Sequence, residues 1–332
     1  MKELQAIVGH LASADGAGVL VTLTSVQGSS YRRPGARMFI GAKGGRIGSV
    51  SGGCLEEDLI LRSADVARSG RAQVVTYDTS AENDLVWGVG LGCHGVVKIL
   101  MEPVGPNPDW ALKLAANVGN GRATLLETVW ESEIEPLGTR LASHAGDGTA
   151  HPRPGVFIDR VEPPPQLAIF GAGDDAQPVA RIAIEIGWSV DIADPRPAMA
   201  VAGRFPGAHR VISGPADELV GRISPREGSL ALVMTHHYRH DVPVLRGLLP
   251  LRLGYLGLLG PKKRSERILE DLARDGLAVT QAMRTRLHAP VGLDLGADAP
   301  EEVALSIIAE MKAELSGRDA RPLRERLRPI HG

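Results

Sequence analysis

The sequence predicts an α/β protein in which an N-terminal α/β domain precedes a C-terminal domain with a Rossmann-type parallel sheet. The chain has 332 residues, more than one domain usually contains. The run Pro163-Pro164-Pro165 is typical of a stiff linker between domains. Residues 167–173 join an apolar strand to a glycine turn, and strands alternate with helices after it. We therefore expect two domains, at residues 1–162 and 163–332.

The N-terminal domain is expected to mix helices with strands. Residues 1–14 carry apolar side chains at a helical spacing, and residues 19–26 are β-branched, as in a buried strand. The elements expected after them are a hairpin (37–40 and 46–50), a helix with an acidic first turn (55–61) and two strands (74–77 and 96–100).

Residues 103–165 are rich in proline and indicate an appendage to the first domain. Within them we expect a helix near residues 110–118 and a pair of strands near residues 123–130 and 155–158. The proline run at the end of this segment is the expected linker.

The C-terminal domain alternates strands and helices, as a parallel sheet requires. Its expected strands are 167–170, 189–194, 229–235 and 254–259, and its first helix is 178–186. The strand at 229–235 is almost wholly apolar, which is typical of a sheet covered on both faces. The last long helix is expected to start at a capping Asp298 and to stop at Gly317.

Composition excludes several classes of function. A net charge of −2 gives no electrostatic basis for binding nucleic acid or an acidic membrane. The first residues lack the apolar run of a signal peptide, and no apolar stretch is long enough to span a bilayer. Two cysteines form no disulfide framework, which indicates a reducing compartment. We therefore expect a soluble, cytoplasmic protein with no nucleic-acid or membrane partner.

The glycine turn (Gly171, Ala172 and Gly173) fits the dinucleotide-binding fingerprint. Asp194 ends the next strand about 20 residues later, where such units bind ribose hydroxyls. Asp174 and Asp175, however, put two carboxylates where a pyrophosphate would lie, and like charges repel. The alternative is that one of them caps the following helix.

Two further segments follow strands at the same predicted sheet edge. Residues 235–241 contain three histidines and an aspartate, which are either metal ligands or hydrogen-bonding groups in the crevice; His236 and His240 share an i, i+4 spacing. Lys262, Lys263 and Arg264 indicate either an anion site or a solvated basic turn.

Both cysteines lie among glycines. Cys54 follows Ser51-Gly52-Gly53 and precedes the predicted helix, whose dipole would stabilise a thiolate. Cys93 lies in Gly92-Cys93-His94-Gly95. The alternative is a small buried thiol, a frequent fate of cysteine. Arg32, Arg33 and Arg37 add cations that could hold an anionic ligand.

Taken together, these segments resemble the XdhC/CoxI family of xanthine dehydrogenase accessory proteins. The N-terminal resemblance runs through Gln27-Gly28-Ser29-Ser30 and Pro34-Gly35-Ala36-Arg37-Met38 to Ser51-Gly52-Gly53-Cys54-Leu55-Glu56. The C-terminal resemblance includes Phe170-Gly171-Ala172-Gly173, Asp194-Pro195-Arg196-Pro197, Thr235-His236, Gly260-Pro261-Lys262-Lys263-Arg264 and Pro300-Glu301-Glu302. The matching stretches cover both domains and leave mainly the middle segment outside.

The resemblance implies a chaperone for molybdenum cofactor rather than an enzyme with its own turnover. Family members are understood to hold the cofactor while a cysteine desulfurase adds a sulfido ligand, and then to pass it to an apo molybdenum hydroxylase. Cys54 would approach the molybdenum as a soft ligand. The residues expected to bind the cofactor are Arg37, Ser51, Gly52, Gly53, Cys54, Cys93, Gly171, Gly173, Asp194, Arg196, His236, Lys262, Lys263 and Arg264.

Two positions depart from the family pattern. Asp174 stands where the family usually has histidine, and His94 interrupts a turn that commonly reads Gly-Cys-Gly-Gly. Both departures are consistent with a divergent paralogue whose cofactor or client differs.

Three hypotheses follow. The first is a molybdenum-cofactor-binding maturation factor, with the Rossmann crevice as a second wall of the Cys54 site. The second is an NAD(P)-dependent oxidoreductase, although the two aspartates predict weak or absent nucleotide binding. The third is a scaffold that only docks a desulfurase to its client. Apolar edges need cover, so a homodimer is one expected assembly.

Overall fold

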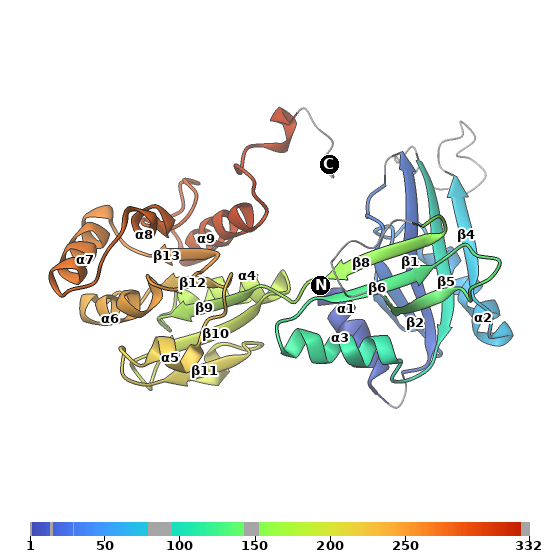
Figure 1. The fold of residues 1–332 in the computed structure, drawn as a ribbon, viewed down its shortest axis with the longest axis horizontal. Coiled ribbons are helices and arrows are strands. Elements are labelled where there is room, and N and C mark those ends of the chain that lie inside the picture. Colours follow the sequence, from blue (N-terminus) through green and yellow to red (C-terminus); the bar gives the residue numbers. More distant parts are fainter. Residues whose placement is uncertain (1, 14–15, 29, 79–94, 143–152, 327–332) are drawn as a thin grey trace. The chain divides into compact units, whose positions relative to one another are not determined.

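The chain forms two compact units, Met1–Pro163 and Pro164–Gly332 (Figure 1). The computed structural model describes residues 2–13, 16–28, 30–78, 95–142 and 153–326. Among these residues, none of the helices has the length and apolar character needed to cross a bilayer.

The first unit is built on a five-stranded antiparallel sheet. Its strands are β1 (Gly18–Gly28), β2 (Arg37–Gly41), β3 (Arg46–Gly48), β4 (Gln73–Asp78) and β5 (Gly95–Val104). Their order in the sheet is β3-β2-β1-β5-β4. The expected hairpin is confirmed, since Met38 pairs with Gly48 and Ile40 with Arg46. The β-branched strand β1 lies in the centre of the sheet, where both of its neighbours help to bury it.

One face of this sheet is covered by α2 (Glu56–Ser69). Leu59 and Val66 of the helix are buried against Met38 and Ile40 of β2, with further apolar side chains from β1 and β5. The helix ends at Gly70, whose φ of 65° is in the left-handed region that glycine adopts without strain.

The opposite face is covered by α1 (Lys2–Leu11), α3 (Asp109–Gly119) and a three-stranded antiparallel sheet. That sheet consists of β6 (Thr124–Val129), β7 (Gly138–Leu141) and β8 (Val156–Val161), in the order β7-β6-β8. Leu20 and Phe39 of the larger sheet share a core with Trp110, Leu126 and Val161. The segment expected to be an appendage is therefore a layer of the unit, because its apolar side chains complete this core.

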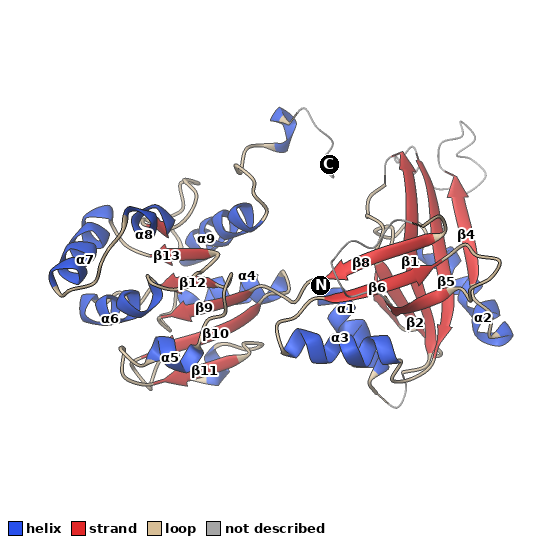
Figure 2. Ribbon diagram, viewed as in Figure 1, coloured by secondary structure: helices blue, strands red, loops and turns tan. Residues whose placement is uncertain are grey.

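The second unit is a doubly wound parallel sheet, which confirms the predicted fold class (Figure 2). Its strands are β9 (Gln166–Phe170), β10 (Ser189–Asp194), β11 (Arg210–Ser213), β12 (Leu230–Val233), β13 (Tyr255–Leu258) and β14 (Leu287–His288). The order β11-β10-β9-β12-β13-β14 is the 3-2-1-4-5-6 order of Rossmann folds. The carboxyl ends of β9 and β12, neighbours at the point where this order reverses, therefore form the expected ligand-binding edge.

Helices cover both faces of the parallel sheet. The helices are α4 (Ala176–Glu185), α5 (Leu219–Ile223), α6 (Tyr238–Leu248), α7 (Lys262–Arg274), α8 (Gln281–Arg286) and α9 (Pro300–Leu315). Leu167 and Ile169 of β9 contribute to the core that contains α4 and α9. Ala168 and Phe170 contribute to the core that contains α5, α6 and α7. This alternation explains why residues 167–170 of the strand are all apolar.

The residues that cap the starts of α4 and α9 differ from those expected. Neither Asp175 nor Asp298 caps a helix with its side chain: α4 starts after Asp175 without a side-chain cap, and α9 starts at Pro300. Instead, the carboxylate of Glu302 accepts hydrogen bonds from the backbone N–H groups of Asp298 and Ala299. The acid in the first turn thus does the capping expected of the aspartate before it.

Candidate functional site

The loop that carries Cys54 is folded around a buried carboxylate. This Cys54 loop, residues 49–55, leads from β3 into α2, and Glu56 at the start of the helix is fully buried. Its Oε1 accepts hydrogen bonds from Ser49 Oγ, Val50 N and Ser51 N, at 2.8 to 3.0 Å. Its Oε2 accepts them from Ser51 Oγ, Gly53 N and Leu55 N. One side chain thus fixes most of the loop.

These hydrogen bonds shift the acidity of Glu56. Burial by itself raises the pKa of the carboxyl group, but hydrogen bonds from Ser51, Ser49 and Val50 outweigh it. The net effect lowers the pKa from 4.5 to about 2. The carboxylate therefore stays ionised at neutral pH, the form that accepts all of these hydrogen bonds.

Cys54 itself is exposed on this fixed loop. The alternative of a buried thiol is therefore wrong. Gly53, directly before it, has a φ of 123°, and a Cβ atom placed there would meet no atom within 4 Å. The exposed Cys54 is thus preceded by a residue that adds no side chain and has open space around it.

Tyr31 is a neighbour of the Cys54 loop that sequence reasoning missed. A Cβ atom added at Gly52 would lie 2.8 Å from ring carbons of Tyr31, so the aromatic ring lies directly over this glycine. The side chain is 67% exposed, which is unusual for a large apolar group. An aromatic residue directly before Arg32 and Arg33 was the available signal, but the contact joins positions far apart in the chain.

Arg37 does not join Cys54. Arg37 is only 4% exposed, and its Nη1 donates to Asp159 Oδ2 of β8 at 2.6 Å. Since Met38 beside it packs toward α2, Arg37 points to the opposite face of the sheet. Cys93 and His94 lie outside the described residues, so their predicted roles stay predictions.

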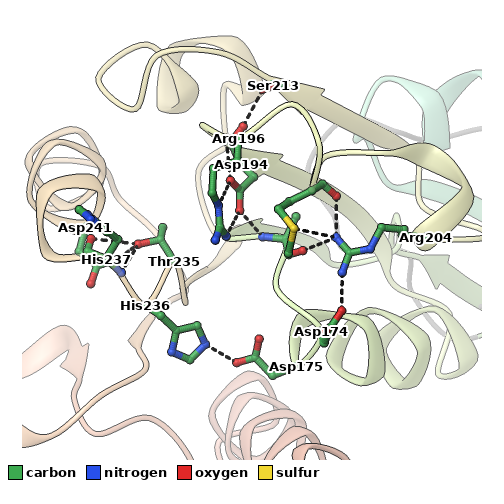
Figure 3. Close-up of polar contacts among 12 residues, drawn as sticks. Asp174, Asp175, Asp194, Arg196, Arg204, Ser213, Thr235, His236, His237 and Asp241 are labelled. Atoms are coloured by element: carbon green, nitrogen blue, oxygen red, sulfur yellow. Dashed lines mark hydrogen bonds and ion pairs between the residues drawn. The ribbon is translucent and has the colours of Figure 1, made fainter.

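In the second unit, Asp194 holds the glycine turn together (Figure 3). The side chain is fully buried, and its Oδ2 accepts hydrogen bonds from Ala172 N at 2.7 Å and Arg196 Nη2 at 2.8 Å. Its Oδ1 accepts them from the backbone N and Nε of Arg196. Both carboxylate oxygens, which were expected to accept ribose hydroxyls, are thus engaged by the chain itself.

The two aspartates after the glycine turn point in different directions (Figure 3). Asp174 is largely exposed and accepts a hydrogen bond from Arg204 Nη2 at 2.7 Å. Arg204 also donates to the carbonyl oxygens of Ala172 and Met199. Asp175 turns the other way, and its Oδ2 lies 2.6 Å from Nε2 of His236.

The segment after β12 forms a second polar cluster. Thr235 Oγ1 donates to Asp241 Oδ1 at 2.6 Å, and Asp241 is buried. Arg264 donates through Nε and Nη2 to Asp241 Oδ2, so this guanidinium is already paired. His237 and His240 stack with ring centroids 4.5 Å apart. Across the described parts of the chain, no three His, Cys, Asp or Glu side chains form a cluster that could hold a metal ion.

Lys262 and Lys263, two of the predicted anion-binding cations, lie exposed at the start of α7. Both are exposed in the first turn of α7, directly after the edge formed by β13. No side chain caps the start of this helix, so the backbone N–H groups of its first turn are directed toward the space before the helix, where an anion is favoured. Of the three predicted cations at this turn, the two lysines are exposed and Arg264 is paired with Asp241, so the binding of an anion by the lysines stays a prediction.

Comparison with known proteins finds relatives over most of the chain. Residues 167–311 match the XdhC Rossmann domain, and residues 11–78 match the XdhC and CoxI family. A probable xanthine dehydrogenase subunit of Bacillus subtilis (strain 168) is 31% identical over 88% of this chain and 92% of its own. The molybdenum cofactor insertion chaperone PaoD of Escherichia coli (strain K12) is 27% identical over 93% of this chain and 86% of its own.

A solved structure extends the likeness to three dimensions. The crystal structure of a xanthine dehydrogenase from Bacillus halodurans superposes with a TM-score of 0.81 at 29% identity and covers 98% of each chain. Sequence and fold therefore agree, and they confirm the resemblance carried by the motifs. This chain belongs to the XdhC and CoxI family.

Proposed function

We propose that this protein is an accessory factor that binds molybdenum cofactor and passes it to a xanthine dehydrogenase-type molybdenum hydroxylase. The observation that carries the proposal is the exposed Cys54 on a loop fixed by the buried Glu56 carboxylate. The names of the relatives support the same role, since one is a probable xanthine dehydrogenase subunit and another a cofactor insertion chaperone.

The residues present fit such a cofactor. A cysteine thiolate is a soft donor of the kind that softer metal centres accept. Cys54 is exposed, and the Tyr31 ring over Gly52 adds an exposed aromatic surface to the same loop. The expectation that Lys262 and Lys263 of the second unit bind an anionic group stays a separate prediction. The bound group supplies redox chemistry to the client enzyme, so this chain has to hold, orient and release it.

A cysteine desulfurase is the second partner in this proposal. An exposed cofactor site would let a desulfurase reach the cofactor before transfer, and Cys54 lies on such an exposed loop. In this scheme the chain contributes binding and positioning rather than its own turnover.

Cofactor retention tests the proposal directly. After anaerobic mixing with molybdenum cofactor and gel filtration, we expect the wild-type protein to retain both molybdenum and pterin. Cys54→Ala and Cys54→Ser should each retain at least about tenfold less, because neither side chain offers a soft donor. Metal analysis and pterin fluorescence of the eluted protein measure the two components.

The exposed Glu57, next to the anchoring Glu56, provides the control. Glu57→Gln should retain the cofactor as the wild type does. If the wild-type protein retains neither molybdenum nor pterin, the proposal is wrong. If Cys54→Ala retains the cofactor fully, Cys54 is not one of its ligands.

An NAD(P)-dependent oxidoreductase is the second candidate, and the strand order of the parallel sheet favours it. Against it, both oxygens of Asp194 are occupied by Ala172 and Arg196, and Asp175 lies at the glycine turn. We expect titration with NADH or NADPH, followed by calorimetry, to show no saturable binding at millimolar concentration. Saturable binding of NADH or NADPH below millimolar concentration would instead support the oxidoreductase.

A further inference from the structure

The space above the glycine turn is filled by a side chain of the chain itself. In dinucleotide-binding units the second glycine of the turn lets a diphosphate come close, because it has no Cβ. In this unit, a Cβ atom added at Gly173 would lie 2.5 Å from Asp175 Oδ1 and 3.9 Å from His236 Cδ2. The Asp175 carboxylate therefore lies over the glycine, where a phosphate would approach.

His236 completes this arrangement from the turn that follows the neighbouring strand β12. Its Nε2 lies 2.6 Å from Asp175 Oδ2, and the two side chains point toward each other (Figure 3). His236 has a φ of 58°, in the left-handed region that side chains other than glycine seldom adopt. This backbone conformation turns the imidazole back toward the glycine turn.

Both partners are held by the backbone around them. A Cβ atom at Gly171 would collide with the carbonyl of Met234, so the glycine turn and the end of β12 touch directly. Thr235 accepts a hydrogen bond from His237 N and donates to the buried Asp241, which fixes the turn that carries His236. The Asp175–His236 contact is thus built into two adjoining turns.

The nearby guanidinium groups of Arg196 and Arg204 hydrogen-bond to other groups than Asp175, although the charge of Arg196 acts on this carboxylate. Arg196 is bound to Asp194, and Arg204 is bound to Asp174 and to two carbonyl groups. A phosphate brought to Gly173 would face the negative charge of Asp175 at close range, and it would have to displace Asp175 from His236.

We propose that Asp175 and His236 are specificity-determining residues that close the glycine turn to phosphate-bearing nucleotides. The Asp175 carboxylate occupies the position that a phosphate would take over Gly173, and the His236 imidazole lies within hydrogen-bonding distance of it. This inference concerns what the Rossmann unit rejects, so it goes beyond the proposed function of Cys54, which lies in the other unit. Its failure would leave that function standing.

The test is a gain of binding measured by calorimetry with ADP as the probe. We expect no saturable binding of ADP to the wild-type protein at millimolar concentration. Asp175→Ala should bind ADP at least about tenfold more tightly, because the competing charge is gone. Adenosine, which lacks the phosphates, should show no such gain. Asp175 makes no capping hydrogen bond to α4, so the variant keeps its helix start.

Two further variants make the result decisive. Asp175→Asn keeps the shape but not the charge, and it should show a part of the gain. Asp174→Asn removes the same charge one residue away, where the side chain is exposed and turned to Arg204, and it should show none. The proposal is overturned if the wild type binds ADP as tightly as Asp175→Ala, if Asp175→Ala shows no gain, or if Asp174→Asn matches it. A thermal melt of each variant verifies that it is folded.

Discussion

Glu56→Gln is expected to destabilise the first unit by about 3 kcal/mol at neutral pH. The wild-type carboxylate accepts hydrogen bonds from Ser49, Val50, Ser51, Gly53 and Leu55, and it is fully buried. A glutamine amide keeps one oxygen, but its NH2 group would face donors and leave some of them unpaired. The lowering of the pKa from 4.5 to about 2 corresponds to about 3 kcal/mol of differential stabilisation.

The same pKa shift fixes how this effect depends on pH. Since the folded-state pKa lies below the unfolded-state value of 4.5, the stabilisation is fully present above pH 4.5. It is lost progressively as the pH falls from 4.5 toward 2. The difference in free energy of unfolding between the wild type and Glu56→Gln should therefore narrow over this window.

Urea titrations followed by tryptophan fluorescence between about pH 7 and pH 3 measure the difference, with the buried Trp110 as a reporter in this unit. Glu57→Gln is the matched control: it removes an exposed carboxylate from the same turn and should cost less than about 0.5 kcal/mol. The assigned role of Glu56 as the anchor of the Cys54 loop would be contradicted in two cases. In the first, Glu56→Gln lowers the free energy of unfolding no more than Glu57→Gln does. In the second, the difference between the wild type and Glu56→Gln grows as the pH falls.

Asp194→Asn is expected to destabilise the Rossmann unit by about 3 kcal/mol, because it disrupts a buried, charge-assisted network. Four donors converge on the two oxygens of Asp194, and one of them is the backbone N–H of Ala172 within the glycine turn. An asparagine oxygen can serve only part of this set, and its NH2 group would oppose the rest. The turn should loosen together with the end of β10.

The stabilisation that Asp194 contributes to the folded state depends on pH in the same direction as that of Glu56. Burial by itself raises the pKa of Asp194, but hydrogen bonds from Arg196 and Ala172 outweigh it and lower the pKa below 3.8. The stabilisation is therefore present above pH 3.8 and declines as the pH falls below it. Denaturant unfolding, with the buried Trp188 reporting on this unit, measures the effect. Asp217→Asn, at an exposed position of the same unit, is the control, and a comparable cost for both variants would refute the prediction.

Much of the fold could be predicted from local patterns. The apolar strand before Gly171 and the alternation after it were enough to predict a Rossmann unit, because a parallel sheet covered on both faces requires uniformly apolar strands. The hairpin around residues 41–45 followed from its glycines. The role of residues 103–162 was not predictable, since β6, β7 and β8 are defined by the sheet they cover rather than by their own sequence.

The candidate site was predicted less completely than the fold. The motif around Cys54 gave the thiol and its glycines, and the structure adds its exposure and its two unexpected neighbours, Glu56 and Tyr31. Arg37 looked like a ligand cation, yet it is buried against Asp159, 122 residues away in sequence. Arg264 likewise looked free, yet it is paired with the buried Asp241.

The sequence by itself thus determined the two-part α/β organisation, the glycine turn and the glycine-rich loop around Cys54, because each depends on neighbours within a few residues. Only the tertiary structure decided which charged groups are available. Arg264 and Arg37 are engaged by partners from other elements, and Asp194 is engaged by Ala172 of the glycine turn together with the nearby Arg196, whereas Lys262 and Lys263 are left exposed. The physical reason is that the availability of a charged group depends on what it contacts in the folded chain. The contacts of Arg37, Arg264 and the glycine turn join residues that are far apart in the sequence.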